Sequence, residues 1–155
     1  MTFEKATITD TEALTDLRIA YLQEDLGPIS DEDLKIIKNS LPSYYSKHLQ
    51  NDLEVYVCRV DGDIVACTFL LIVEKPMSPS FITGKTGTVL NVYTKPQHRH
   101  KGLARQLMTM MLEDATKMKI SVIELKSTED GYPLYQSVGF EDSPAHYHNM
   151  RYILN

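Results

Sequence analysis

Alternating apolar and polar residues dominate the middle of the chain and predict β-strands there. From residue 53 to residue 74 the period is two on both sides of Asp61 and Gly62, a dipeptide typical of a two-residue hairpin turn. Residues 84–94 repeat the alternation. Three shorter segments of the same kind predict a first, an inner and a last strand, at residues 3–8, 121–126 and 148–155.

Apolar residues that recur every three or four positions predict four helices. Ser30 is a good N-cap for the second helix, Pro42 is expected to end it, and Gly139 is expected to close the fourth. The leucines and methionines of the third helix are interpreted as core, not as a cofactor site. The four helices are expected over residues 13–26, 30–41, 103–118 and 130–139.

These elements follow one another as strand, helix, helix, three strands, helix, strand, helix and two strands. Hydrophobic residues make up 43% of the 155 positions, which is enough for one core, and no repeat or linker divides the chain. We therefore expect a single domain over residues 1–155, built as a mixed sheet with helices on both faces.

The net charge of −5 argues against general nucleic-acid binding, because that mode requires a cationic face. The N-terminus lacks the pattern of a secretory signal, and the longest apolar run, residues 64–73, is about half as long as a membrane-spanning helix. We expect a cytoplasmic protein with neither a nucleic-acid nor a membrane partner.

Cys58 and Cys67 flank the predicted hairpin turn. Counting back from the turn pairs Cys58 with Val65 and makes the two cysteines diagonal neighbours, with α-carbons roughly 7 Å or more apart. Two reduced thiols are therefore expected. No metal is expected either, because no cluster has ligand spacing; His146 and His148 remain an alternative base or metal site without a third ligand.

A basic segment joins the strand that ends near residue 94 to the third helix. Its four cations, Lys95, Arg99, Lys101 and Arg105, have no carboxylate among them. A helix start carries unpaired N–H groups and partial positive charge, and Gly102 would let an anion come close to it. In an acidic chain, this pattern predicts a site for a small anionic ligand such as a phosphate.

This segment and a second one near the C-terminus resemble the signature segments of the GNAT acetyltransferase superfamily. In LNVYTKPQHRHKGLARQLM, the residues Arg99, Gly102 and Ala104 fill the loop pattern of that family. In YPLYQSVGF, about thirty residues later, a tyrosine and a Gly-Phe pair follow. Two departures stand out: His100 replaces a common glycine, and Thr128 with Gly131 replaces an Asn and an Ala.

The resemblance implies a mixed α/β fold with a mostly antiparallel sheet of six to seven strands and four helices. It also implies acetyl-CoA as cosubstrate, with the pyrophosphate on the backbone N–H groups of residues 99–104. The preceding strand would splay from its neighbour and offer backbone groups of Val92 and Thr94 to the pantetheine arm. The expected coenzyme-binding residues are Val92, Tyr93, Thr94, Arg99, His100, Lys101, Gly102, Leu103, Ala104, Arg105 and Thr128.

Two residues are candidates for the chemistry. The resemblance implies that Tyr135 lies near the thioester sulfur and acts as an acid or hydrogen-bond donor. An amine with a pKa near 10.4 is about one part in a thousand neutral at physiological pH, equivalent to roughly 4 kcal/mol, so a base is needed. Glu24 at the end of the first helix is the candidate base, with Glu74 as second choice.

The sequence therefore predicts an N-acetyltransferase that transfers the acetyl group of acetyl-CoA to a primary amine of a small molecule or amino-acid-like substrate. Two alternatives stay open: acetylation of a protein N-terminus or lysine, and a CoA-binding regulatory module without turnover. The expected partner is a small-molecule amine, and a homodimer is left open.

Overall fold

Five strands form one mixed sheet in the computed structural model, which describes residues 1–144 and 146–155. The strand order is β1-β2-β3-β4-β5, and every neighbouring pair is antiparallel except β4 and β5, which are parallel. The strands are β1 (Thr2–Lys5), β2 (Leu53–Val60), β3 (Asp63–Glu74), β4 (Lys85–Thr94) and β5 (Val122–Glu124).

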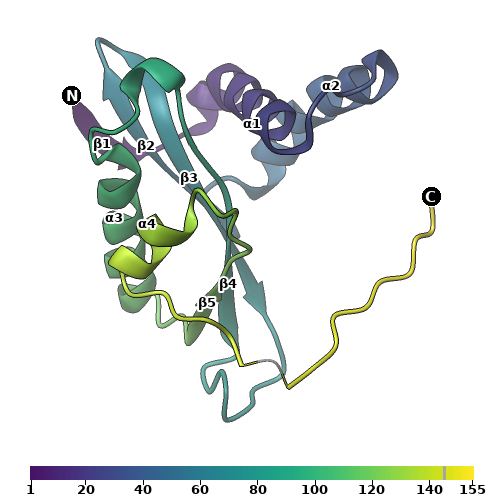
Figure 1. Cartoon of the computed structure of the whole chain (residues 1–155), viewed down its shortest axis with the longest axis vertical. Coiled ribbons are helices and arrows are strands. Elements are labelled where there is room, and N and C mark those ends of the chain that lie inside the picture. Colours follow the sequence, from purple (N-terminus) through teal and green to yellow (C-terminus); the bar gives the residue numbers. More distant parts are fainter. Residues whose placement is uncertain (145) are drawn as a thin grey trace.

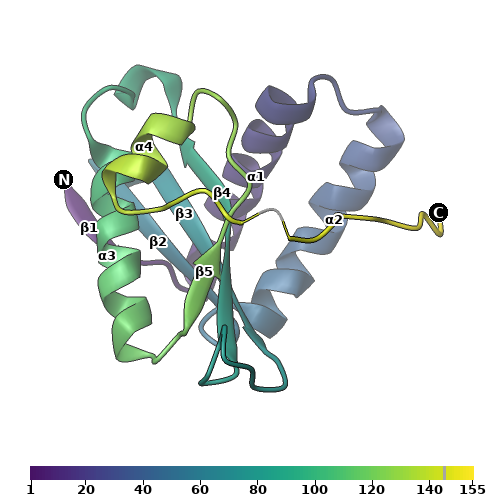
Figure 2. The same ribbon diagram turned by 60° about the horizontal axis from the view of Figure 1, so that its bottom comes forward.

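Helices cover both faces of the sheet, as expected (Figures 1 and 2). Helices α1 (Thr11–Leu26) and α2 (Asp31–His48) pack on one face, and α3 (Leu103–Lys117) and α4 (Tyr132–Ser137) pack on the other. Each face has its own buried cluster. Helix α3 contributes Leu107, Met108 and Met111 to the cluster on its own face, which confirms the core role of its methionines. The predicted mixed α/β fold with four helices is therefore confirmed.

The prediction of strands after the fourth helix is wrong. The described residues that follow α4 form no strand, so the sheet has five strands where six or seven were expected. Phe140 does return to the core, but residues 146–155 run away from it, and the C-terminus lies clear of the sheet in both views (Figures 1 and 2). A strand forms only beside an edge with which it can pair, and this tail reaches none of its own.

Pro42 does not end the second helix, which continues to His48. A proline removes one helical hydrogen bond, here the one to the carbonyl of Lys38. Both residues are exposed, so water can satisfy that carbonyl. One turn later Tyr45 is fully buried and donates a hydrogen bond from its hydroxyl to Leu14 O at 3.4 Å. Tertiary packing of Tyr45 thus offsets the local cost of the proline.

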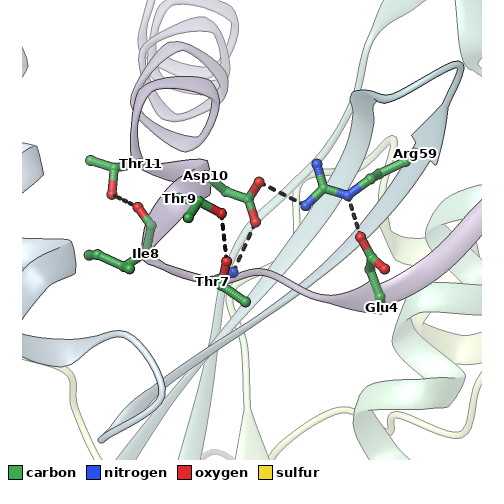
Figure 3. Close-up of polar contacts among 7 residues, drawn as sticks. All are labelled: Glu4, Thr7, Ile8, Thr9, Asp10, Thr11 and Arg59. Atoms are coloured by element: carbon green, nitrogen blue, oxygen red, sulfur yellow. Dashed lines mark hydrogen bonds and ion pairs between the residues drawn. The ribbon is translucent and has the colours of Figure 1, made fainter.

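The first strand is shorter than the expected residues 3–8, because a polar cluster turns the chain into α1 (Figure 3). The carboxylate of Asp10 accepts hydrogen bonds from Thr7 N at 2.9 Å and from Arg59 Nη2 at 2.7 Å. The same guanidinium donates through Nε to Glu4. Asp10 is buried, so these donors supply the pairing that a buried charge requires and fix the start of the helix.

Cys58 and Cys67 are both buried and free, but their expected register is wrong. A bulge after Cys58 shifts the β2–β3 pairing, so Cys58 lies opposite Ala66 rather than Val65. Consequently Cys58 belongs to the cluster under α3, whereas Cys67 belongs to the cluster under α1 and α2. The two thiols face opposite sides of the sheet, which is a stronger reason against a disulfide than their distance.

A partly buried polar network ties β1 and β2 to α3. Tyr56 is fully buried, and its hydroxyl donates to Asp114 Oδ2 at 2.6 Å, while Lys5 Nζ approaches the same oxygen to 2.6 Å. Burial alone would raise the pKa of Asp114, but the hydrogen bonds from Lys5 and Tyr56 outweigh it and hold this pKa below its usual range. Asp114 therefore stabilises the fold above the unfolded pKa of about 3.9, and this contribution is lost as pH falls further.

We expect the substitution Tyr56→Phe to lower the free energy of unfolding by about 1–2 kcal/mol at neutral pH, because it removes a buried hydrogen bond to a charged group. Chemical denaturation measures this difference. The matched control is Tyr132→Phe, which removes an exposed hydroxyl bonded to Asp142 at 2.9 Å and should change stability by less than about 0.5 kcal/mol. Equal effects of the two substitutions would contradict the role given to the network.

Candidate active site

The loop between β4 and α3 has the backbone of an anion-binding site. After a short 3-10 turn over Pro96–His98, two residues adopt left-handed conformations: His100 has φ 61° and Gly102 has φ 77°. Such alternation turns successive N–H groups toward one side of the chain. The first bond of the helix runs from Gln106 N to Gly102 O, so the N–H groups before it lack helical partners. These are the donors a phosphate would take.

Gly102 leaves the approach to these donors open. A Cβ placed on this residue would meet no atom within 4 Å, so the space in front of the helix start is free. His100 occupies a left-handed position that glycine adopts more readily. This accounts for the glycine that is common at this position of the resembled loop pattern. Leu103 is buried, so this residue offers its N–H group but not its side chain.

Arg99 faces away from the open side of the loop. Its Nη2 donates to Glu24 Oε2 at 2.6 Å, its Nε donates to Thr94 O at 2.8 Å, and its guanidinium lies 5.6 Å from the ring centre of Tyr93. The side chain therefore fastens the loop to the end of α1 and to β4. Positive charge on the open side is left to Lys101 and Arg105, which are both exposed.

One edge of β4 is open beside the loop. Pairing between β4 and β5 covers only Thr86, Gly87 and Thr88, so the strand has no β5 partner over residues 89–94. Val92 packs toward the α3 side and Tyr93 toward the α1 side, as the alternation predicts. The carbonyl of Thr94 is already taken by Arg99, which leaves Val92 as the better placed of the two expected backbone contacts.

Tyr135 lies on α4, half-buried against the α3 side of the sheet. Its ring packs edge-on to Phe140 at 6.1 Å, and a Cβ at Gly131 would come within 3.0 Å of ring atom Cε2, so the glycine makes room for the ring. Burial first, and the neighbouring phenol of Tyr21 second, raise the pKa of Tyr135 to about 12. Tyr21 belongs to α1, on the opposite face of the sheet. The Tyr135 ring therefore lies on the α3 side of the sheet, close enough to α1 for the two phenols to influence each other.

Glu24 and Thr128 make internal contacts in this structure. Glu24 is engaged by Arg99 and lies at the C-terminal end of α1. The hydroxyl of Thr128 accepts a hydrogen bond from Gly131 N at 3.2 Å, and its carbonyl accepts one from Tyr132 N at 3.1 Å. Thr128 thus holds the start of α4 and, through it, the position of Tyr135. Its direct contact with the coenzyme stays a prediction.

The sequence analysis did not assign Asn91 and Arg18 to the site, although both lie at this part of β4. Asn91 adopts a left-handed conformation at φ 53° where a bulge shifts the β3–β4 register, and it is buried. Its Oδ1 accepts a hydrogen bond from Arg18 Nη1 at 3.2 Å, and its Nδ2 donates to Cys67 Sγ at 3.5 Å. The available signal was an asparagine inside an apolar strand, since Asn tolerates this conformation better than most residues.

Two hollows lie near the site but not at the opening itself. A groove of about 510 Å³ runs along the outer side of α3, between Phe3 and Thr109, and shares only Gly102 and Arg105 with the loop. A smaller one of about 240 Å³ lies between α1 and β4, next to Tyr93 and Lys95. We place the candidate site at the opening of β4 because the unpaired edge and the anion-binding loop adjoin there.

The described part of the chain holds no group of three or more His, Cys, Asp or Glu side chains arranged to bind a metal ion. His146 and His148 do not gain a third ligand there. None of the helices in residues 1–144 and 146–155 is both long and apolar enough to cross a membrane.

Comparison with known proteins agrees with this geometry. The model of the acetyltransferase (GNAT) family matches residues 12–140. A predicted acetyltransferase from Clostridium acetobutylicum, crystallised with acetyl-CoA, is 25% identical, with a TM-score of 0.84 over 97% of this chain and 95% of that one. A GCN5-related N-acetyltransferase from Ralstonia eutropha is 25% identical, with a TM-score of 0.81 over 97% of both chains.

A ribosomal-protein-alanine N-acetyltransferase from Brucella melitensis shares the fold at 20% identity, with a TM-score of 0.72 over 98% of this chain and all of that chain. No curated protein matched the sequence. The family match spans most of the chain and includes both signature segments, the loop before α3 and the helix that carries Tyr135. The chain belongs to the GNAT acetyltransferase family.

Proposed function

We propose that the protein transfers the acetyl group of acetyl-CoA to the primary amine of a small molecule. The observation that carries this proposal is the unpaired edge of β4 over residues 89–94, with the open loop at one end and Tyr135 beside it. The residues fit the coenzyme: an extended amide-containing arm can pair with the strand edge, and a diphosphate can occupy the space in front of Gly102. Lys101 and Arg105 supply charge.

In this proposal Tyr135 stabilises the leaving thiolate as a hydrogen-bond donor. Acetyl-CoA supplies a thioester, whose sulfur gains negative charge as the amine attacks. A full proton transfer from a phenol with a pKa of about 12 to a thiolate with a conjugate pKa near 8.5 is uphill by about 5 kcal/mol. Donation without transfer avoids that cost and still stabilises charge where it develops.

The incoming amine must lose a proton, and the candidate base Glu24 is already engaged in an ion pair with Arg99. Its carboxylate is held by Arg99 at 2.6 Å, and taking a proton there would break that pair. Glu74 lies opposite Lys85 at the other end of β4, on the paired side of the opening. We therefore assign Glu24 to holding the loop and infer that water receives the proton; Glu24 as base stays a prediction.

A second observation favours an acceptor that carries a carboxylate near its amine. Arg18 is half-buried between α1 and β4, and no ion pair joins it to a carboxylate among the described residues. Its guanidinium lies 5.9 Å from the ring centre of Tyr21. Burial first, and the charge of a nearby carboxylate second, raise the pKa of Tyr21 and of Tyr44; the carboxylates are Asp25 and Asp52 respectively, and the charge of Arg18 opposes both rises.

A half-buried cation without a counter-charge attracts an anion, and a guanidinium matches a carboxylate in shape. Arg18 contacts Asn91 at the bulge of β4, on the strand proposed to bind the pantetheine arm, so a carboxylate bound by Arg18 would lie near the reacting end of the coenzyme. This arrangement supports an amino-acid-like acceptor, within the wider class of small amines.

We expect Arg18→Gln to raise KM for an amino acid about ten- to a hundredfold, because a charge-assisted contact is worth about 1.5–3 kcal/mol. KM for acetyl-CoA should stay within about twofold, and KM for the amide of the same amino acid should not change. Steady-state kinetics with each pair of acceptors measures the split. An equal rise of KM for the amino acid and for its amide would contradict the proposal that Arg18 binds the carboxylate of the acceptor.

The proposed activity is tested by incubating the purified chain with acetyl-CoA and a panel of amines, amino acids, their amides, polyamines and short peptides, and recording thiol release. We expect release that depends on a small amine. Release with peptides alone would favour acetylation of protein N-termini. Binding of acetyl-CoA without any amine-dependent release would contradict the proposal and favour a regulatory module.

A further inference from the structure

The last ten residues hold five large apolar side chains in water. The exposed fractions are 87% for Tyr147, 91% for Met150, 87% for Tyr152, 67% for Ile153 and 89% for Leu154. Adjoining exposed apolar side chains mark a surface that another surface covers. The tail contacts neither the sheet nor the helices near its end, where it lies clear of both in the two views (Figures 1 and 2). The surface that would bury these side chains is therefore not part of the same chain.

The tail has the composition of a strand. Met150, Tyr152 and Leu154 alternate, residues 146–155 contain neither proline nor glycine, and Arg151 is their one Lys, Arg, Asp or Glu residue. This is the segment that the sequence predicts as a last strand. What it lacks in the chain is a neighbouring strand.

Strand β5 offers such a neighbour. It is the last strand of the sheet and pairs with β4 alone, so its other edge has no strand partner among the described residues. Ile123 and Leu125 pack toward the cluster under α3, and Glu124 between them is exposed. An unpaired edge flanked by apolar residues is a template for an added strand.

We propose that two copies of this chain exchange their C-terminal tails, so that residues 147–154 of each copy add as an antiparallel strand to β5 of the other. Placing Arg151 opposite the partner's Glu124 puts Tyr152 beside Ile123 and Met150 beside Leu125. Both apolar pairs then lie on the α3 side of the sheet, and Leu154 continues the same stripe. One register therefore matches the charges and the apolar residues together.

Exchange between copies fits better than a return within one chain. The C-terminus lies far from β5 in both views, so pairing within the chain would require the tail to turn back toward its own β5 (Figures 1 and 2). A reciprocal exchange covers both tails and both β5 edges and closes the assembly as a dimer. Each half then has a sixth strand, the lower of the two numbers expected from the sequence. The inference does not depend on the acceptor or on catalysis.

The test is a crosslink between two different chains. Glu124→Cys and Arg151→Cys are made as single variants with different tags, co-expressed, and joined with a short bis-maleimide. The native thiols give little background, because both are buried and burial raises the pKa of Cys58 and, to about 12, that of Cys67. We expect a crosslinked heterodimer from the mixture and at least tenfold less crosslinked dimer from either variant alone.

Sedimentation of the unmodified chain provides an independent measurement, with an expected mass of twice 17.7 kDa. Glu124→Arg should raise the dimer dissociation constant at least tenfold, and adding Arg151→Glu to it should restore most of the loss. A monomer at micromolar concentration would overturn the proposal. So would an intrachain crosslink in the double variant Glu124→Cys/Arg151→Cys together with no crosslink between chains.

Discussion

Turnover is expected to fall at least tenfold when Tyr135 is replaced by Phe, with acetyl-CoA affinity changed less than about twofold. The substitution removes one hydroxyl and keeps the ring that packs on Phe140, so α4 should stay in place. Loss of a donor that acts on developing charge costs kcat, whereas a packing role would cost stability instead. Burst and steady-state thiol release, together with calorimetric binding of acetyl-CoA, separate these two effects.

The control for this substitution is Tyr132→Phe in the same helix. Tyr132 is exposed and its hydroxyl bonds to Asp142, so kcat should stay within about twofold of the unmodified value. Because the pKa of Tyr135 is raised to about 12, its hydroxyl stays protonated through the neutral range and is lost as a donor only as pH rises through that value. Unchanged turnover in Tyr135→Phe would remove this residue from the mechanism.

Replacing Gly102 with Val should raise the dissociation constant of acetyl-CoA at least thirtyfold. A valine Cβ would enter the open space in front of the helix start, where the diphosphate is expected, and a β-branched residue also strains the left-handed conformation. The loss corresponds to about 2 kcal/mol of binding free energy. Calorimetry with acetyl-CoA, accompanied by thermal unfolding, provides the measurement.

Gly62 provides a matched control for the strain. It lies in the β2–β3 turn at φ 86°, and a Cβ there also meets no atom within 4 Å. Gly62→Val should therefore lower the free energy of unfolding by about 1–2 kcal/mol, as the same strain does in Gly102→Val. It should leave acetyl-CoA binding unchanged. Equal losses of affinity in the two variants would show that backbone strain, not the blocked approach, explains the result at Gly102.

Local patterns predicted most of the fold. The Asp-Gly turn, the Ser30 cap and the stripe of α3 are read directly from neighbouring residues, and all three are present. The errors have non-local causes. Buried Tyr45 carries α2 past Pro42, and a bulge after Cys58 shifts the hairpin register. The detached tail depends on which strand edge is within reach, which no local pattern contains.

The parts of the candidate site that lie in short continuous segments could be predicted from the sequence, whereas contacts between distant residues could not. The loop before α3 and the position of Tyr135 follow from two short segments. Arg18 and Asn91 are 73 positions apart, and their contact depends on a bulge that brings Asn91 into a left-handed conformation. The pairing of Glu24 with Arg99 is equally remote in sequence, and it fastens the loop to the end of α1; Glu24 as base stays a prediction.

The most direct test of the central claim is an amide NMR spectrum of the labelled chain titrated with acetyl-CoA. The account predicts that the largest shifts fall on two sets of amides, residues 99–104 in the loop and residues 89–94 on the open edge of β4. Shifts confined to the groove between Phe3 and α3, or no shifts at millimolar acetyl-CoA, would contradict it.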